Sequence, residues 1–478
     1  MPDRLKLIVI LMVGCIAAVV CVDEPLALSI IIGITAVCLV PFVHRPPSRG
    51  FDLFEPVYIT VISMWLAYGM NGLAILYFPD MVASLPGVDV FSKDLTLVLS
   101  IILLGIFFYI IGYSLPFPGR LVTQGCDFTL FRGIEGWWAK ILVLYCFGWG
   151  VRILFLFQGK YTAFIAPEES QTSNADAILY NLWLIPIYAY VLAWIHWANP
   201  KAPRFKAVQL IAVLTILEVG FFLFQGSKTY LTLLLLLPLV ALHYQGIRIR
   251  WRILAIAALT IALVVFPYVG AYRDTILAQS LGGDADLISP AVLYNSATEA
   301  AATMYDRSVD RSGNVYDAFF SRWGGVAPTV AIVERVPNDF PYLYGEDFAL
   351  LPFVLVPRVV IPWKPTARSN SYLTEDIIGT YGCSISPFPI GEWYLNFGVV
   401  GVVLGMLFFG AFQRGYYEML MGHPDSLKQF IYVGTFLPIT NINSWISTTV
   451  VVGLIQVVAV LLIIVYFMGG RLRRGTVK

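Results

Sequence analysis

Long runs of apolar residues, separated by short polar stretches, recur along almost the whole chain. A run of roughly 17 to 25 apolar residues is what a helix needs to cross a bilayer. The pattern predicts twelve spans, at 5–22, 26–43, 57–78, 95–115, 137–157, 177–197, 207–224, 229–243, 251–270, 395–413, 428–442 and 445–467. The eighth and eleventh are short, so either could be a pair of half-spans. The first run lacks a small-residue cleavage site, so we expect a retained helix and not a signal peptide.

The basic residues favour one orientation of these spans. With the N-terminus in the cytoplasm, the inner connections and tails hold most of the Lys and Arg, including clusters at 201–206 and 471–474. The short outer loops hold Lys93, Lys160 and Lys228. Because positively charged loops stay inside, we expect both termini in the cytoplasm.

One outer connection, residues 271–394, is far longer than the others. It mixes aromatic residues, prolines and both charge signs, so we expect a folded domain between membrane regions 1–270 and 395–478. Within it, residues 348–363 are apolar but broken by prolines, which indicates an interfacial or re-entrant segment. The predicted fold is therefore all-α, a polytopic membrane protein of about twelve transmembrane helices with one large outer loop domain.

Composition agrees with a membrane protein and narrows its chemistry. The chain is 58% hydrophobic and 13% charged, against roughly 25% charged residues in soluble domains. The net charge of +1 gives no sign of a nucleic-acid partner. The cysteines form no zinc-binding pattern, and P-loop and Rossmann glycine motifs are absent, so no cofactor is expected.

Three basic residues fall near the outer ends of predicted spans: Arg152 in the fifth, Lys228 after the seventh and Arg273 beyond the ninth. Each has a structural explanation, because Lys228 and Arg273 can extend to the membrane surface and Arg152 can pair with Glu218. Together, at one depth, they predict an anion site, since arginine and lysine bind phosphate oxygens. An anion reached from the outer leaflet suggests a lipid-linked phosphate or diphosphate.

The long connection also carries residue types that bind sugars. Aromatic faces stack on pyranose rings, while charged groups bond the hydroxyls. The candidates are Arg322, Trp323, Trp363 and Tyr394. An interfacial aromatic belt and the core of the outer domain are the alternative for the aromatic residues.

A carboxylate is the candidate for acid–base chemistry at the outer side. All four histidines fall on or near the predicted inner side, so an outer base has to be a carboxylate or a tyrosine. Glu392, just before the tenth span, is the best placed. Its structural alternative is a carboxylate at a helix N-terminus that interacts with the helix dipole and caps it.

Four motifs resemble the oligosaccharide repeat-unit polymerases of the O-antigen (Wzy) type. They are "GSK" at 226–228, "YRD" at 272–274, "VPRVVIPWKP" at 356–365 and "PFPIGEWYLNFGVVGVVLG" at 387–405. The order of the motifs and the long outer connection match as well. The resemblance covers about residues 140 to 415.

The resemblance implies a metal-independent, GT-C-like glycosyltransferase in a bacterial plasma (inner) membrane. An undecaprenyl-diphosphate-linked glycan would be transferred to the non-reducing end of a new lipid-linked unit at the outer leaflet. Carried over to this chain, Lys228, Arg273 and Arg358 would hold the diphosphate, with Arg152 in support. A chain-length-regulating co-polymerase is the expected protein partner, and no nucleic acid is expected.

Three other functions stay open from the sequence. An O-antigen ligase would use the same donor, but it relies on a histidine in the outer loop, which this chain lacks. A transporter of lipid-linked sugars would show midplane charges, internal repeats and short loops on both sides. A non-catalytic assembly scaffold would tolerate conservative changes at Glu392 and the basic residues.

Overall fold

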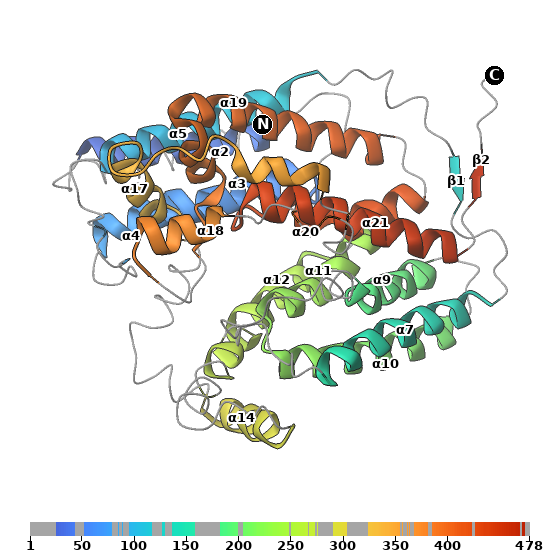
Figure 1. Cartoon of the computed structure of the whole chain (residues 1–478). Coiled ribbons are helices and arrows are strands. Elements are labelled where there is room, and N and C mark those ends of the chain that lie inside the picture. The colour runs from blue at the N-terminus through green and yellow to red at the C-terminus, as the bar shows by residue number, and fades with distance from the viewer. Residues whose placement is uncertain are drawn as a thin grey trace, which may run out of the picture.

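The computed structural model describes the larger part of the chain. The described residues are 25–43, 52–78, 85, 88, 95–116, 127–129, 136–157, 182–198, 204–247, 250–265, 267–272, 275, 290–303, 324–353, 356, 361, 363, 368–380, 385–422, 426–468 and 471–473. This part is helical apart from one antiparallel pair of three-residue strands (Figure 1), which joins β1 (Asp127–Thr129) to β2 (Arg471–Arg473).

The helices are labelled here in chain order. In order they are α2 (Pro25–Val43), α3 (Pro56–Met64), η1 (Trp65–Met70), α4 (Asn71–Tyr77), α5 (Leu95–Ser114), α7 (Trp137–Phe157), α9 (Ile185–Ala198), α10 (Arg204–Gln225), α11 (Lys228–Tyr244), α12 (Trp251–Thr260), η3 (Ile261–Val265), α14 (Pro290–Thr303), α17 (Val326–Arg335), η4 (Glu346–Phe353), α18 (Ser369–Ser371), η5 (Tyr372–Ile377), α19 (Phe388–Met421), α20 (Ser426–Thr440), η6 (Ile446–Val451) and α21 (Val452–Phe467).

Every predicted span after the first coincides with one of these helices or with a run of consecutive helices. Six stretches are long and apolar enough to cross a membrane, which indicates a membrane protein: Pro25–Val43, Pro56–Tyr77, Leu95–Ser114, Trp137–Phe157, Arg204–Gln225 and Phe388–Met421. Other apolar helices, α9, α11 and α21 among them, are shorter. Span 5–22 lies outside the described residues, so twelve crossings remain a prediction.

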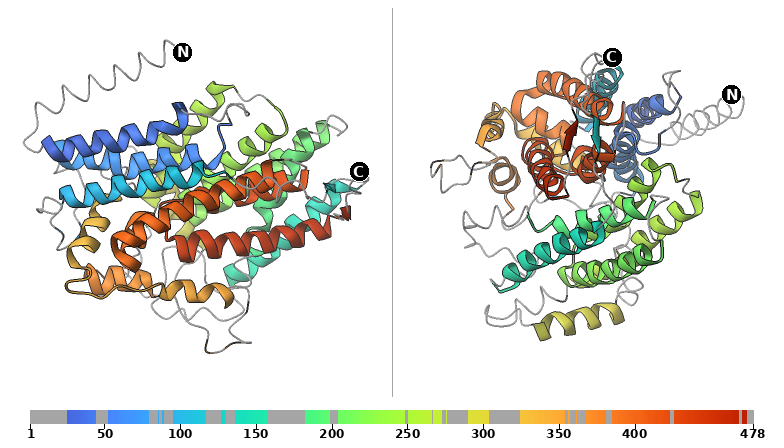
Figure 2. Two further views of the ribbon diagram at one scale, coloured as in Figure 1. Left: turned by 90° about the horizontal axis from the view of Figure 1, so that it is seen from above. Right: turned by 90° about the vertical axis from the view of Figure 1, so that its right-hand side faces the viewer.

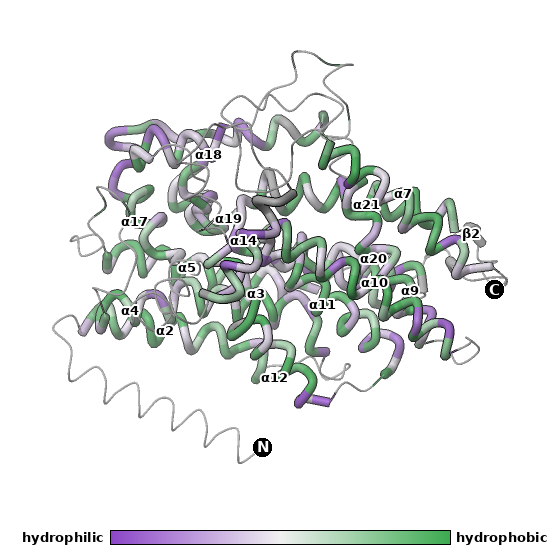
Figure 3. The backbone as a smooth tube through the Cα atoms, turned by 90° about the horizontal axis from the view of Figure 1, so that it is seen from below, coloured by the Kyte–Doolittle hydropathy of each residue, from purple (hydrophilic) through white to green (hydrophobic). Residues whose placement is uncertain are grey.

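Buried apolar side chains form two large cores. The first core is built by α2, α3, α4, α5, α17 and the first part of α19. The second core is built by α7, α9, α10, α11, α20, α21 and the last part of α19. Helix α19 enters both, with Phe409 in the first core and Tyr416 in the second. The long helices run roughly alongside one another (Figure 2), and hydrophobic positions dominate them (Figure 3).

Two glycines bring α5 and α19 into close contact in the first core. A Cβ atom on Gly112 would lie 2.0 Å from the carbonyl oxygen of Leu407. A Cβ atom on Gly410 would lie 2.1 Å from the carbonyl oxygen of Tyr109. Each helix therefore presents a residue without a side chain where the backbone of the other passes. Small residues at such crossings let helix backbones approach closely in membrane proteins.

A polar cluster lies where the two cores meet, and we call it the Asp52 cluster. It consists of Asp52, Glu55, Tyr113, His243, Tyr244, Arg414, Tyr417 and Glu418. One Asp52 oxygen lies 3.0 Å from His243 Nε2, and the other accepts hydrogen bonds from Tyr244 at 2.9 Å and Tyr417 at 2.6 Å. The short segment before α3 is thus tied to both α11 and α19.

Glu55 extends this cluster to α5. Its carboxylate accepts hydrogen bonds from Tyr113 at 2.8 Å and from Arg414 at 3.0 Å, and Arg414 also pairs with Glu418. Burial raises the pKa of Asp52, but the hydrogen bonds from His243, Tyr417 and Tyr244 outweigh it and leave that pKa below its ordinary value. Asp52 therefore stabilises the folded chain as a carboxylate, and this contribution would be lost as the pH falls through its lowered pKa.

The described parts of the long connection do not gather in one place. Helix α17 is buried in the first core. At its start, Val326 N donates a hydrogen bond to Asn71 Oδ1 of α4 at 3.3 Å. Helix α14 instead lies against α10, at the edge of the second group of helices (Figure 1). Of the predicted re-entrant segment 348–363, the structure describes the end of η4 and a few single residues. A separate outer domain therefore stays a prediction.

The glycine crossing predicts the effect of a single methyl group. We expect Gly112→Ala to lower the free energy of unfolding by about 1–3 kcal/mol or more, because α5 and α19 must move apart. Gly220→Ala is the control, since a Cβ atom there meets nothing within 4 Å. Thermal unfolding of the detergent-solubilised variants measures both. Equal melting temperatures for the two variants would contradict the close crossing.

The Asp52 cluster predicts a cost for an isosteric change. Asp52→Asn replaces one of the two acceptor oxygens with an amide donor, so a hydrogen bond from the tyrosine pair or His243 is lost. We expect the free energy of unfolding to fall by about 1.5–3 kcal/mol, the range for hydrogen bonds to charged groups. Asp339→Asn, at an exposed position, is the control in the same melting experiment. A melting temperature unchanged by Asp52→Asn would show that the cluster does not join the cores.

Candidate functional site

The turn between α10 and α11 carries the first of the predicted site motifs. We call residues 225–228 the GSK turn. Gly226 has φ +63°, a backbone conformation that glycine adopts at little cost. Ser227 is the N-cap of α11 and its hydroxyl accepts a hydrogen bond from Tyr230 N at 3.4 Å. Lys228 is thereby the first residue of α11, at the helix end where the backbone dipoles favour negative charge.

A hydrogen bond brings the second motif to this turn. The Tyr272 hydroxyl donates to the carbonyl oxygen of Phe224 at 2.5 Å, two residues before Gly226. The ring of Tyr268 stacks on Tyr272 with centroids 5.9 Å apart, which fixes the direction of this segment. The "GSK" and "YRD" motifs therefore meet at one end of the helices. Arg273 itself lies outside the described residues.

Arg152 is paired within the second core, below this turn. Its guanidinium bonds both oxygens of Glu218, at 2.6 and 2.9 Å, and its Nε donates to the carbonyl oxygen of Trp183 at 3.3 Å. Tyr145 adds a hydrogen bond to Glu218 at 2.9 Å. Arg152 is 1% exposed and Glu218 0% exposed. The arrangement is the structural ion pair that the sequence left open, and a diphosphate-binding role for Arg152 stays a prediction.

Aromatic rings connect this pair to the GSK turn. The Arg152 guanidinium carbon lies 5.1 Å from the ring centre of Phe222. Phe222 in turn stacks on Tyr230, in the first turn of α11, with centroids 5.1 Å apart. Arg152 therefore supports the position of the turn through packing. A charge-paired arginine with this role carries no distinct sequence signal beyond its place in an apolar run.

Glu392 is buried and caps another helix. Its carboxylate accepts hydrogen bonds from the backbone N–H of Ile446, from the backbone N–H of Ser447 at 2.9 Å and from the Ser447 hydroxyl at 2.5 Å. These groups belong to the first turn of η6, whose N–H groups have no partner within the helix. The sequence left open a carboxylate that caps its own helix, whereas Glu392 caps η6. Its role as a base stays a prediction.

Asp347 performs the same task for a second helix, and sequence reasoning missed it. It is 4% exposed and accepts hydrogen bonds from the backbone N–H of Arg368 at 3.0 Å and Ser369 at 3.3 Å. These N–H groups begin the helical segment of α18 and η5. An N-cap usually stands next to the helix that it caps, but Asp347 acts across 21 residues. No local spacing pattern could have revealed it.

Helix α19 is broken between Glu392 and the part that enters the second core. Phe397 and Gly398 leave the helical conformation, and Gly398 has φ +64°. The carbonyl groups before the break accept hydrogen bonds from Leu343 N at 3.1 Å and Tyr344 N at 3.2 Å. The Asn396 side chain accepts a third from Gly345 N at 2.8 Å. The long connection thus satisfies the end of the first half-helix and is fixed to it.

The candidate sugar-binding residues differ in accessibility. Trp363 is 71% exposed and meets Phe353 edge-on, whereas Tyr394 is 8% exposed and packs against Tyr342. Arg322 and Trp323 lie outside the described residues, as does Arg358, the remaining candidate for diphosphate binding. Trp363 is thus accessible, while Tyr394 belongs to the first core, and sugar binding by either residue stays a prediction.

The structure does not bring all predicted site residues together. Lys228 and Arg152 belong to helices of the second core, whereas the helix of Glu392 begins in the first. Within the described part of the chain, no hydrogen bond or ion pair joins Glu392 to the GSK turn. The same part holds no group of three or more His, Cys, Asp or Glu side chains that could bind a metal ion. No protein-family model, curated protein or solved structure matches the chain.

The capping role of Glu392 predicts that Glu392→Gln destabilises the fold. The amide nitrogen cannot accept from the η6 backbone, so at least one buried N–H loses its partner. We expect a loss of about 1.5–3 kcal/mol in the free energy of unfolding. Glu346→Gln, at an exposed position nearby in the long connection, is the control for thermal unfolding. If the Glu392 variant melted with the wild type, the cap would contribute nothing to stability and the buried charge of Glu392 would need another explanation.

Proposed function

We propose that this protein is a polymerase of lipid-linked oligosaccharide repeat units. It transfers the growing undecaprenyl-diphosphate-linked glycan to the non-reducing end of a new lipid-linked unit, at the outer leaflet of a bacterial plasma membrane. The polymer is a surface polysaccharide. The Lys228 end of the helices faces outward in this proposal, and both termini lie in the cytoplasm, as the distribution of basic residues favours.

One observation carries the proposal: the hydrogen bond from Tyr272 to Phe224, which joins the "GSK" and "YRD" motifs. These two motifs come from segments 48 residues apart, and each ends in or contains a basic residue of the predicted anion site. A cation at the start of α11 suits an anion, because the helix dipole adds to its charge. The six apolar helices support a reaction on a membrane lipid.

In this glycosyl transfer, stabilising the negative charge on the leaving diphosphate matters more than a strong nucleophile. The acceptor hydroxyl oxygen attacks the anomeric carbon of the donor sugar, and the bond from that carbon to the diphosphate oxygen breaks. The diphosphate leaves with the bonding electron pair. Lys228 stabilises the charge that develops on it, which is worth most where water is excluded.

The hydroxyl proton passes to a carboxylate, for which Glu392 remains the candidate. Its buried carboxylate already accepts the Ser447 hydroxyl at 2.5 Å. An acceptor hydroxyl would have to take the place of Ser447, which requires η6 to shift. Loss of activity in Glu392→Gln therefore supports a base only if the same protein is still folded.

Reconstitution tests the proposal directly. Purified protein is mixed with a lipid-linked repeat unit, without metal or nucleotide sugar, and the product is resolved as a ladder on a gel. We expect a ladder from the wild type and a rate roughly 100-fold lower from Lys228→Ala, the cost of removing one charge-stabilising group. Lys206→Ala, at the opposite end of α10, is the matched control and should polymerise normally.

Two outcomes would contradict the proposal in different ways. No ladder, with movement of the lipid-linked sugar across a liposome bilayer, would make the protein a transporter. A ladder that Lys228→Ala leaves unchanged would keep the polymerase but remove the anion site from the GSK turn.

A further inference from the structure

An apolar groove of about 350 Å³ lies beside the GSK turn. It opens between the end of α10, the η3 region and α14, the helix that stands at the edge of the second group in Figure 1. Its lining residues are Leu223, Phe224, Val264, Val265, Tyr268, Tyr294, Ala297, Thr298 and Ala301. The volume is at the small end of the range for ligand sites, about 300–1,000 Å³.

Helix α14 forms one wall of this groove with a single face. Tyr294 precedes the neighbours Ala297 and Thr298 by three and four residues, and Ala301 follows them by four and three, so all four lie along one side of the helix. Three of the four are small, which leaves room between α14 and α10. The helix belongs to the long connection and yet packs against the second group of helices. Without α14 the groove would have no wall on that side.

The groove adjoins the GSK turn. Phe224 lines it, and its carbonyl oxygen accepts the hydrogen bond from Tyr272. Tyr268 also lines it and stacks on Tyr272. Lys228 follows Phe224 by four residues, at the start of α11. An apolar groove thus adjoins the turn that carries Lys228, and such an arrangement complements an amphiphile with an anionic head.

A polar atom at the turn agrees with a ligand there. Gln225 is 5% exposed, and its Oε1 meets no hydrogen-bond donor in the described part of the chain. A buried acceptor without a donor is costly, so it calls for a hydroxyl or water; in the proposed donor only the sugar next to the diphosphate carries such hydroxyls.

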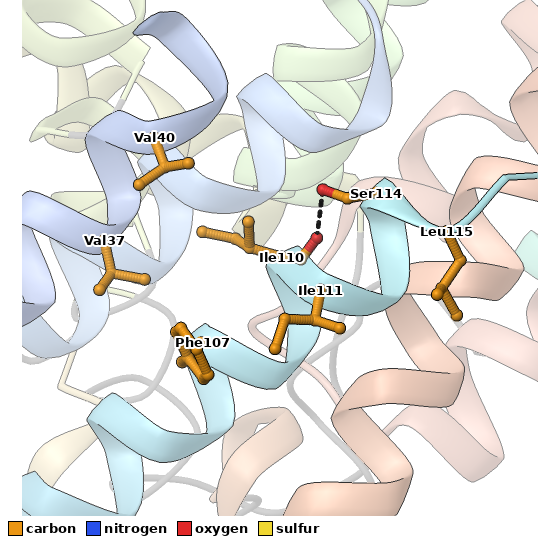
Figure 4. Close-up of a pocket in the computed structure, with 7 residues that line it drawn as sticks. All are labelled: Val37, Val40, Phe107, Ile110, Ile111, Ser114 and Leu115. Carbon is orange, nitrogen blue, oxygen red and sulfur yellow. Dashed lines mark hydrogen bonds between the residues drawn. The ribbon is translucent and has the colours of Figure 1, made fainter. Parts of the chain in front are cut away.

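A second apolar groove of similar volume serves as a comparison. It has about 320 Å³ and lies between α2 and α5, lined by Val37, Val40, Phe107, Ile110, Ile111, Ser114 and Leu115 (Figure 4). The Ser114 hydroxyl donates within its own helix, to Ile110 O at 2.7 Å. Among the residues that the structure describes, none of its lining residues shares a hydrogen bond or ring contact with a turn that carries a basic residue.

We propose that the groove between α10 and α14 holds the head-proximal hydrocarbon chain of the lipid diphosphate, with the diphosphate at Lys228. This inference rests on the proposed function and gives its donor a defined position. Lys228 binds the charged head, and the walls of the groove bind the first part of the chain. The rest of a long chain extends into the bilayer, so the protein recognises a short chain almost as well as a long one.

Short soluble probes test the groove apart from catalysis. Binding of farnesyl diphosphate, inorganic diphosphate and farnesol is measured on the full chain in nanodiscs. We expect the wild type to bind farnesyl diphosphate at least about 10-fold more tightly than inorganic diphosphate, since burial of apolar carbons adds to the charge interaction. Ala301→Trp should remove most of that difference and leave inorganic diphosphate binding unchanged. Lys228→Ala should weaken both diphosphates.

Ala302→Trp is the matched control, because Ala302 is exposed on α14 and does not line the groove. Ala297→Leu is a second, smaller filling of the same groove, in case Ala301→Trp fails to fold. Equal binding of farnesyl and inorganic diphosphate would overturn the inference, as would equal effects of Ala301→Trp and Ala302→Trp. Farnesol bound as tightly as farnesyl diphosphate would show partition into the lipid only, which also overturns it.

These outcomes separate the two proposals. If the wild type forms the ladder but binds farnesyl diphosphate no more tightly than inorganic diphosphate, the groove proposal is overturned and the polymerase proposal stands. A wild type that forms no ladder but shows the predicted binding pattern overturns the polymerase and keeps an amphiphile site.

Discussion

The carboxylate of Asp52 is the interaction on which the arrangement of the two cores depends. It stands in a short segment between α2 and α3, yet it binds side chains of α11 and α19. Tyr432 of α20 adds a hydrogen bond to the carbonyl oxygen of Phe54 at 2.6 Å, two residues further on. The hydrophobic effect is non-directional, so apolar packing alone would not fix the position of one core relative to the other. Directed hydrogen bonds to one half-buried carboxylate fix their register at this end.

The same principle appears at the other end, where carboxylates cap helices that begin far away in the chain. Glu392 holds the start of η6, and Asp347 holds the start of α18 and η5. A helix that begins inside the protein exposes N–H groups that water cannot reach, and a buried acid satisfies several at once. The break in α19 at Gly398 belongs to the same scheme, because the long connection completes the half-helix before it. A carboxylate committed to capping needs a conformational change before it can accept a proton from a substrate.

The GSK turn has a different character. Its glycine and serine shape the start of α11, and the charge of Lys228 stands next to an apolar groove. Below it, the Arg152–Glu218 pair neutralises the two buried charges and stiffens the helices through Phe222. Lys228 lies above that pair, half-buried at the start of α11. The proposed donor, a lipid with an anionic head, matches the charge of Lys228 through its head and the apolar groove through its hydrocarbon chain.

The apolar runs alone located the long helices, since each predicted span within the described residues overlaps a helix or a run of helices, whereas α14 and α17 of the long connection were not predicted. The sequence also placed the "GSK" interruption between two of them and singled out Arg152, Glu218 and Glu392 as unusual charges in apolar surroundings. Local patterns hold this information because a helix and its turns are made by neighbours in the chain. The sequence named Glu218 as a possible partner of Arg152, and the tertiary structure formed that pair across 66 residues. Only the tertiary structure brought Ser447 to Glu392, across 55 residues. No local pattern encodes such distances, because only the packed helices bring those side chains within hydrogen-bonding range.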